Sequence, residues 1–176
     1  MSPGEKQRDR SDPFEQLEKS HRKLQENLAA LRAAVVTLNE RPDDAEALAA
    51  VIEVSGFVDR TVVRHEKDEE ESLFPRLRDD AELAPLIEQL EREHREHEKL
   101  HERLRAIAGA CDGALSDEDR ARLGALVDEL DAAYEKHVDV EEGELFPAAK
   151  AALDAATQRA IAEEMQARRG RGGKRR

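Results

Sequence analysis

The sequence predicts an all-α protein, an antiparallel up-down four-helix bundle with a short extra C-terminal helix. Of its 176 residues, 40% are charged and 3% are aromatic, a composition that favours helices over sheets. Apolar residues recur at intervals of three and four, which is the period of a helix with one buried face. A histidine-containing phrase occurs twice, so we expect two helical hairpins.

The first helix is expected to follow a disordered lead-in. Residues 1–11 are polar, carry both charge signs and lack apolar periodicity. Asp12 and Pro13 have the residue types of an N-cap and of the first helical position. The helix that follows carries an apolar stripe, and His21 occupies a core position on it.

The second helix is expected to follow a turn near Pro42 and to carry the first copy of the repeated phrase. That phrase, His-x-x-x-Glu-Glu-x-x-Leu-Phe-Pro, begins at His65 and begins again 72 residues later at His137. In each copy the histidine and the first glutamate, Glu69 or Glu141, are four residues apart. On a helix they share one face and can bind the same ion.

The third and fourth helices form the second expected hairpin. Pro85 opens the third helix, whose buried stripe includes the three histidines His94, His97 and His101. Ser116 and Asp119 are spaced like a capping box and start the fourth helix.

The predicted metal ligands replace apolar residues on these buried stripes. An unpaired buried polar group costs about 1–3 kcal/mol, and a cation removes that cost. Five histidines and two glutamates exceed what one ion needs and suit two ions that share carboxylates. The predicted ligands are His21, His65, Glu69, His97, His101, His137 and Glu141.

One part of this prediction meets a geometric difficulty. His97 and His101 lie 11 to 15 residues before Asp112, whereas His137 lies 21 residues after Ser116. In an antiparallel hairpin this spacing leaves a mismatch of a few turns. Either the connection is longer than assigned or the helices start unevenly.

The domain is expected to span residues 12–150, followed by a helix at 151–167 and a basic disordered tail at 168–176. The tail could contact nucleic acid or an acidic partner, although a solubilising end is the preferred interpretation. The net charge of −12 argues against nucleic-acid binding by the bundle. No apolar run is long enough to span a membrane, there is no leader, and one cysteine fits a reducing compartment. We therefore expect a soluble, cytoplasmic protein.

The phrases resemble those of the hemerythrin-like proteins of the HHE cation-binding family, over residues 13 to about 150. The resemblance rests on a lone His, two His-x-x-x-Glu motifs and one His-x-x-x-His motif, with Leu-Phe-Pro after two of them. It implies a non-haem di-iron centre, in which two iron ions are bridged by two carboxylates and an oxo or hydroxo group. By motif position, Glu69 and Glu141 would be the bridges and the five histidines the terminal ligands. One iron would keep a position for dioxygen or peroxide.

Some residues allow more than one role. His94 could replace His101 as a ligand or donate a hydrogen bond to one. Tyr134 could hydrogen-bond near the cluster, relay an electron or simply pack. Glu66 lies where iron-sensing members of the family recruit an extra carboxylate. For Glu66, and for Glu70 and Glu142, a solvated helix face is the preferred interpretation.

The expected function is binding of dioxygen or a related small oxidant, peroxide or nitric oxide, for sensing, storage or redox response. Oxygen-carrying hemerythrins have an aspartate five residues after the last histidine, whereas this chain has Glu141 four residues after it. This departure argues against simple reversible oxygen carriage. The alternatives are a di-iron enzyme that decomposes hydrogen peroxide or nitric oxide, and an iron-sensing or iron-delivery protein.

Overall fold

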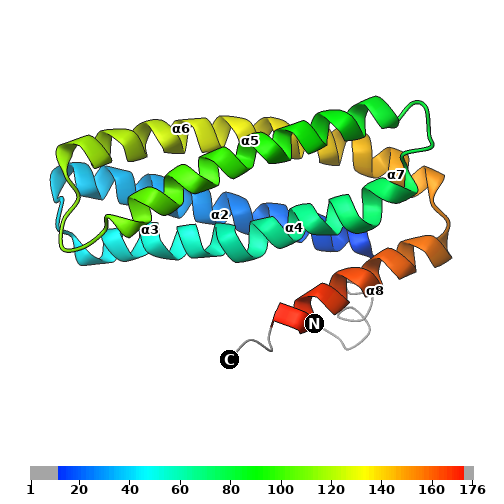
Figure 1. Ribbon diagram of the computed structural model, residues 1–176, viewed down its shortest axis with the longest axis horizontal. Coiled ribbons are helices and arrows are strands. Elements are labelled where there is room, and N and C mark those ends of the chain that lie inside the picture. Colours follow the sequence, from blue (N-terminus) through cyan, green and yellow to red (C-terminus); the bar gives the residue numbers. More distant parts are fainter. Residues whose placement is uncertain (1–11, 173–176) are drawn as a thin grey trace.

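The protein is a bundle of long helices. A computed structural model describes residues 12–172, so the lead-in predicted for residues 1–11 lies outside the described part. Every regular element from 12 to 172 is helical, which confirms the all-α prediction. Figure 1 shows long helical rods side by side along the molecule, with α8 inclined to them on one side.

Several elements join end to end to form the rods. The first rod is α2 (Pro13–Glu40) and the third is α5 (Ala84–Gly109). The second consists of α3 (Ala45–Phe57), η1 (Val58–Val62), α4 (Val63–Asp68), η2 (Glu69–Leu73) and η3 (Phe74–Arg76). The fourth consists of α6 (Asp117–Val140), η4 (Glu141–Leu145) and α7 (Phe146–Ala152), and α8 (Ala155–Gly172) follows it.

The predicted helix starts are present. The side chain of Asp12 accepts a hydrogen bond from the Phe14 amide at 2.9 Å, and Pro85 lies in the first turn of α5. Ser116 Oγ accepts from the Asp119 amide at 3.1 Å. Each cap satisfies an amide that the first helical turn leaves without a partner.

A π-helical turn begins at the first glutamate of each repeated phrase. These turns are η2, which starts at Glu69, and η4, which starts at Glu141. A π turn contains an extra residue, which changes the direction of the side chains that follow it, and such turns are frequent at functional sites. Phe74 and Phe146, which follow the two turns, are at most 1% exposed.

A polar layer separates two apolar clusters. On α2, Leu17 belongs to one cluster and Leu24 to the other, and the buried His21 lies between them. On α5, Leu90 and Leu104 flank the histidines in the same way. The two clusters hold the rods together above and below a layer of ionisable side chains.

The C-terminal region differs from the prediction of one helix at 151–167. The chain breaks between α7 and α8, because Asp154 caps α8 by accepting a hydrogen bond from the Thr157 amide at 2.7 Å. The tail predicted from 168 is helical as far as Gly172; residues 173–176 lie outside the described part. Arg168 stabilises this extension, since its guanidinium lies 2.9 Å from Asp68.

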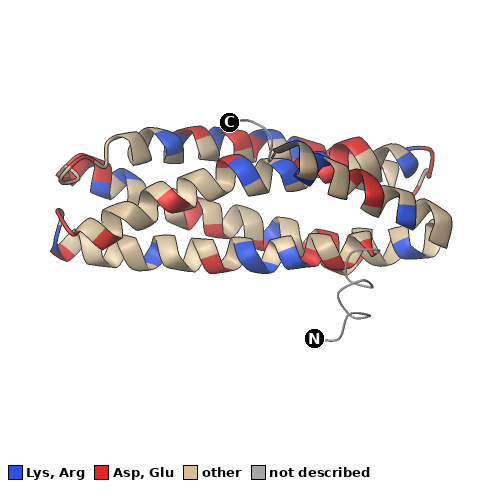
Figure 2. Cartoon of the chain, turned by 90° about the horizontal axis from the view of Figure 1, so that it is seen from below, with Lys and Arg blue, Asp and Glu red and all other residues tan. Residues whose placement is uncertain are grey.

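Basic and acidic residues both occur along the helices (Figure 2). Between residues 12 and 172, no helix combines the length and the apolar character that a membrane span requires.

Candidate metal centre

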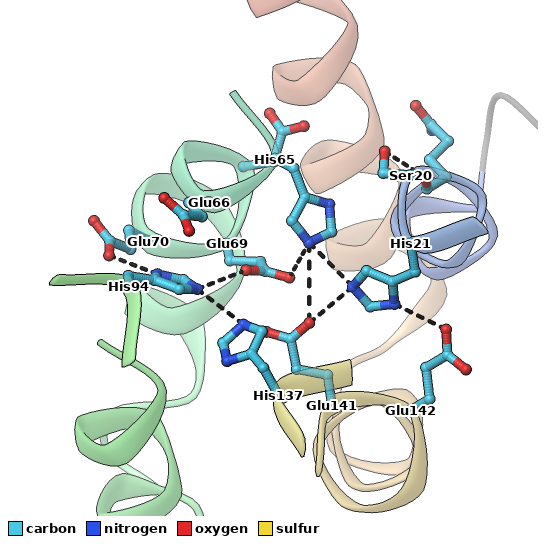
Figure 3. A network of polar contacts seen from close by, with 12 residues as sticks. Ser20, His21, His65, Glu66, Glu69, Glu70, His94, His137, Glu141 and Glu142 are labelled. Carbon is cyan, nitrogen blue, oxygen red and sulfur yellow. Dashed lines mark hydrogen bonds and ion pairs between the residues drawn. The ribbon is translucent and has the colours of Figure 1, made fainter. Parts of the chain in front are cut away.

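All four rods contribute to the buried polar layer. His21 comes from α2, His65 from α4, His94 from α5 and His137 from α6, and all four are at most 8% exposed. Each rod thus places an imidazole in the interior, where Figure 3 shows them around two central glutamates. These glutamates are Glu69 and Glu141, and both are fully buried.

Six of these side chains form two overlapping groups that could each hold a metal ion. In each group, one ligand atom from every residue lies within 4.8 Å of the others. Site A consists of His21, His65, Glu69 and Glu141. Site B consists of Glu69, His94, His137 and Glu141. Each site has two histidines of its own, and both glutamates belong to both sites.

Glu69 turns one carboxylate oxygen toward each site. Its Oε1 lies 3.0 Å from His65 Nε2 in site A, and its Oε2 lies 3.3 Å from His94 Nε2 in site B. A carboxylate in this orientation can bind a different ion with each oxygen.

The two carboxylate oxygens of Glu141 also face different sites. Its Oε2 lies 2.9 Å from His21 Nε2 in site A, and its Oε1 lies 3.0 Å from His137 Nε2 in site B. Despite these short distances, all four oxygens of Glu69 and Glu141 are buried without a properly oriented hydrogen bond. Buried carboxylate oxygens in this condition are costly, and cations in the two sites would satisfy them. The donor set therefore fits two metal ions.

The histidines of each site converge through the same ring atom. His21 Nε2 and His65 Nε2 are 3.1 Å apart in site A, and His94 Nε2 and His137 Nε2 are 3.2 Å apart in site B. Two neutral imidazoles cannot both present a lone pair to one another favourably, whereas both lone pairs can bind one ion. The paired Nε2 atoms are therefore suited to metal binding.

The second glutamate of each phrase orients a histidine from the other hairpin. Glu142 lies 2.8 Å from His21 Nδ1, and Glu70 lies 2.7 Å from His94 Nδ1. Such carboxylates fix the ring orientation of a metal-binding histidine. The interpretation of Glu70 and Glu142 as a purely solvated face is therefore wrong, although each side chain remains 41% exposed.

The phenylalanines of the Leu-Phe-Pro segments support the same two histidines. Phe146 stacks on His21 with ring centroids 5.8 Å apart and planes 7° apart. Phe74 stacks on His94 at 6.0 Å and 14°. The repeated phrase thus supplies a central carboxylate, an orienting carboxylate and a stacking ring.

The nearby carboxylates reverse the effect of burial on the pKa values of the site histidines. Burial by itself lowers the pKa of His65 and His137, but the nearby charges of Glu69 and Glu141 raise it to about 10. Contacts with carboxylates likewise raise the pKa of His94 to about 10. Burial raises the pKa of Glu141, yet the surrounding histidines hold it well below its usual range. In the metal-free protein at pH 7, His65, His94 and His137 are therefore protonated and Glu141 is ionised, and a bound cation would displace the histidine protons.

His97 and His101, two of the predicted ligands, lie outside both sites, and His94 takes the α5 position in site B. His94 is the residue expected as an alternative to His101. The physical reason differs between His97 and His101. His101 lies about two turns farther along α5 than His94. The ring of His97 packs against that of His137, with centroids 4.7 Å apart, but its nitrogens do not join either group of converging ligand atoms.

His97 and His101 instead make their own contacts beside the centre. His97 Nδ1 lies 3.2 Å from Glu66, and the Tyr134 hydroxyl lies 2.5 Å from His101 Nε2. Burial lowers the pKa of His97 to about 3 and that of His101 to about 4. Both rings are therefore neutral at pH 7, and His101 Nε2 and the Tyr134 hydroxyl share one hydrogen bond.

The number of residues between the paired histidines of each hairpin distinguishes His94 from His97 and His101. His21 precedes His65 by 44 residues, and His94 precedes His137 by 43. His97 and His101 precede His137 by 40 and 36 residues. The nearly equal spacing in both hairpins thus identifies His94 as the counterpart of His21.

A small cavity of about 10 Å³ adjoins site A. This volume is close to the minimum for one water molecule. Leu24, Phe57 and Val62 contribute apolar wall, while Glu66 and Tyr134 contribute polar groups. Only a ligand of very few atoms fits without movement of these walls.

Comparison with known proteins gives one match. The family model described as Hemerythrin HHE cation binding domain matches residues 12–149. No curated protein and no solved structure matches the chain. The matched range contains both candidate sites and ends before α8.

Proposed function

The chain belongs to the hemerythrin HHE cation-binding family, and on that premise we propose that it holds two iron ions and binds a small oxidant there. Dioxygen, peroxide and nitric oxide form the class of ligand. In this proposal the four rods are an antiparallel up-down four-helix bundle, and sites A and B each hold one ion. Bound iron would supply an exchangeable coordination position and a change of oxidation state.

The proposal rests mainly on the orientation of the two glutamate carboxylates. Each presents one oxygen to site A and the other to site B. A single ion would leave two of these buried oxygens without a partner, whereas two ions use all four. Four imidazoles and two carboxylates suit iron, although zinc and manganese accept the same donors.

The cavity beside site A supports a small ligand. Its volume of about 10 Å³ excludes organic substrates and leaves room only for a molecule of one or two heavy atoms. Its apolar wall also lowers the local dielectric and excludes bulk water. These properties suit the binding of dioxygen or peroxide for sensing, storage or redox response.

Metal content and the visible spectrum test the proposal together. Freshly purified protein should contain two irons per chain and show charge-transfer bands that change between air and reducing conditions. Zinc alone, or a single ion per chain in a folded protein, would contradict it.

A second candidate function is an enzyme that decomposes hydrogen peroxide or nitric oxide. It is favoured by Glu66 and Tyr134, which place two protonatable groups in the cavity wall. Burial raises the pKa of Glu66 above its ordinary value, which is the direction that a general acid requires. Peroxide turnover by the iron-loaded protein that falls in a Glu66→Gln variant with unchanged metal content would favour the enzyme. Absence of turnover in the wild type would favour binding alone.

A further inference from the structure

A cleft lined by basic side chains lies beside the cavity of site A. Its volume is about 200 Å³. Among the described residues, no aspartate or glutamate lines it, although the chain as a whole has a net charge of −12. We call it the basic cleft, and its lining residues are Gln16, Lys19, Ser20, Lys23, Thr61, Arg64, Gln166 and Arg169.

Three segments that are distant in the sequence form this cleft. Lys23 belongs to α2, Arg64 to α4 and Arg169 to α8. The buried residues Ile161 and Met165 of α8 pack this helix against the bundle and so place Arg169 at the cleft. The concentration of positive charge therefore depends on the tertiary structure and is not a run of basic residues along one helix.

The positive charges in the cleft are only partly compensated. Arg169 donates to Gln16 Oε1 at 3.1 Å, and it lies 3.8 Å from Asp68. The same Asp68 is held more closely by Arg168, at 2.9 Å. Arg169 thus has a share of one carboxylate that another arginine already neutralises.

The positive charges of Arg64 and Lys23 have even less compensation from nearby carboxylates. No carboxylate of residues 12–172 forms an ion pair with either side chain. Burial lowers the pKa of Arg169, and the positive charges of Arg64 and Arg168 lower it further against the opposing effect of Asp68. These neighbouring cations repel one another, and an anion between them would relieve the repulsion.

The basic cleft adjoins the cavity of site A. Ser20 and Thr61 line both spaces, and Ser20 directly precedes His21 on α2 (Figure 3). A molecule in the cleft therefore lies next to the wall of the metal centre. Positive charge in a recess also raises the local concentration of anions.

We propose that the basic cleft binds a small anion of the oxyanion or carboxylate class beside site A. The lining offers guanidinium groups, which recognise such anions through paired hydrogen bonds, and lysine ammonium groups. Gln166 and Arg169 of α8 bound the recess on one side, and the protein around it has a net negative charge; both features disfavour an extended polyanion such as nucleic acid. The site goes beyond the proposed function, because it needs no metal ion.

Calorimetric titration with sulfate tests the proposal. The full-length protein is titrated at constant ionic strength maintained with sodium chloride, so that general screening is held fixed. The test variant combines Lys23→Gln with Arg64→Gln, and neither residue belongs to site A or B. The control combines Arg103→Gln with Arg122→Gln, two exposed arginines with the same total charge that lie outside the cleft.

Saturable binding of one sulfate, weakened about tenfold or more in the cleft variant and less than about twofold in the control, is the expected result; tenfold corresponds to 1.4 kcal/mol. Equal weakening of sulfate binding in both variants would overturn the proposal, because it would show that sulfate responds only to the overall charge of the protein. A lack of saturable binding would also overturn it. The titration is repeated on metal-depleted protein. Sulfate binding that requires the metal would also overturn it, because the ion would then occupy the metal centre. A single Lys23→Glu variant, at an exposed position, gives the same comparison if the double variant does not fold.

Discussion

Replacing His94 with alanine should remove the ion of site B and leave that of site A. Site B has four ligand atoms, one from each of its residues, and the variant keeps three of them. Loss of a residue that merely orients a ligand weakens metal binding about 10–100-fold. Loss of the ligand itself should therefore weaken binding more than about 100-fold, or by more than about 2.7 kcal/mol. Site A keeps both of its histidines.

The matched control is His101→Ala, which removes a buried histidine of the same helix from outside both sites. Metal per chain is measured by mass spectrometry after dialysis against a weak chelator, and circular dichroism checks the helical content. We expect one ion per chain in His94→Ala and two in His101→Ala. Two ions in His94→Ala with loss of an ion in His101→Ala would refute the assignment and restore the ligand set predicted from the family motif.

Three further predictions concern the surroundings of the centre. In metal-depleted protein, the three site histidines with a pKa of about 10 stabilise the fold fully below pH 6.5. This contribution is lost as the pH rises toward 10, so the thermal midpoint should fall over that range; an unchanged midpoint would contradict the histidine–carboxylate pairing. Glu70→Gln should lower the affinity of site B about tenfold in a chelator competition and leave site A unchanged; equal weakening of both sites would refute its role through His94. Tyr134→Phe should retain both ions and destabilise the fold by about 1–3 kcal/mol in urea unfolding, because His101 Nε2 loses its partner; loss of an ion would show that Tyr134 acts on the centre directly.

The sequence was sufficient for the helices and for the repeated phrases because both depend on local signals. Apolar periodicity and the capping residues Asp12 and Ser116 define where helices run and start. The spacing within each phrase places its histidine and first glutamate on one helix face. Neither signal depends on which helices become neighbours.

The choice among the three histidines of α5 depends on a different quantity. His94, His97 and His101 share one helix face, so periodicity cannot separate them. The position and orientation of each ring in the folded protein decide between them, and these depend on how α5 packs against α6. Only the comparison of spacings in the two hairpins carries this information.

Contacts between distant segments account for the remaining differences. Glu142 orients His21, which is 121 residues away, and no local pattern links the two. Arg168 is helical because Asp68, 100 residues away, accepts its hydrogen bond. Composition alone predicted a disordered tail from this position.

The most direct test of the account is the position of the metal ions in crystals, measured by anomalous diffraction at the iron absorption edge. The account predicts two iron positions, each bound by two histidine Nε2 atoms and by one oxygen from each of Glu69 and Glu141. A single iron position, or iron bound to His97 or His101 in place of His94, would contradict it.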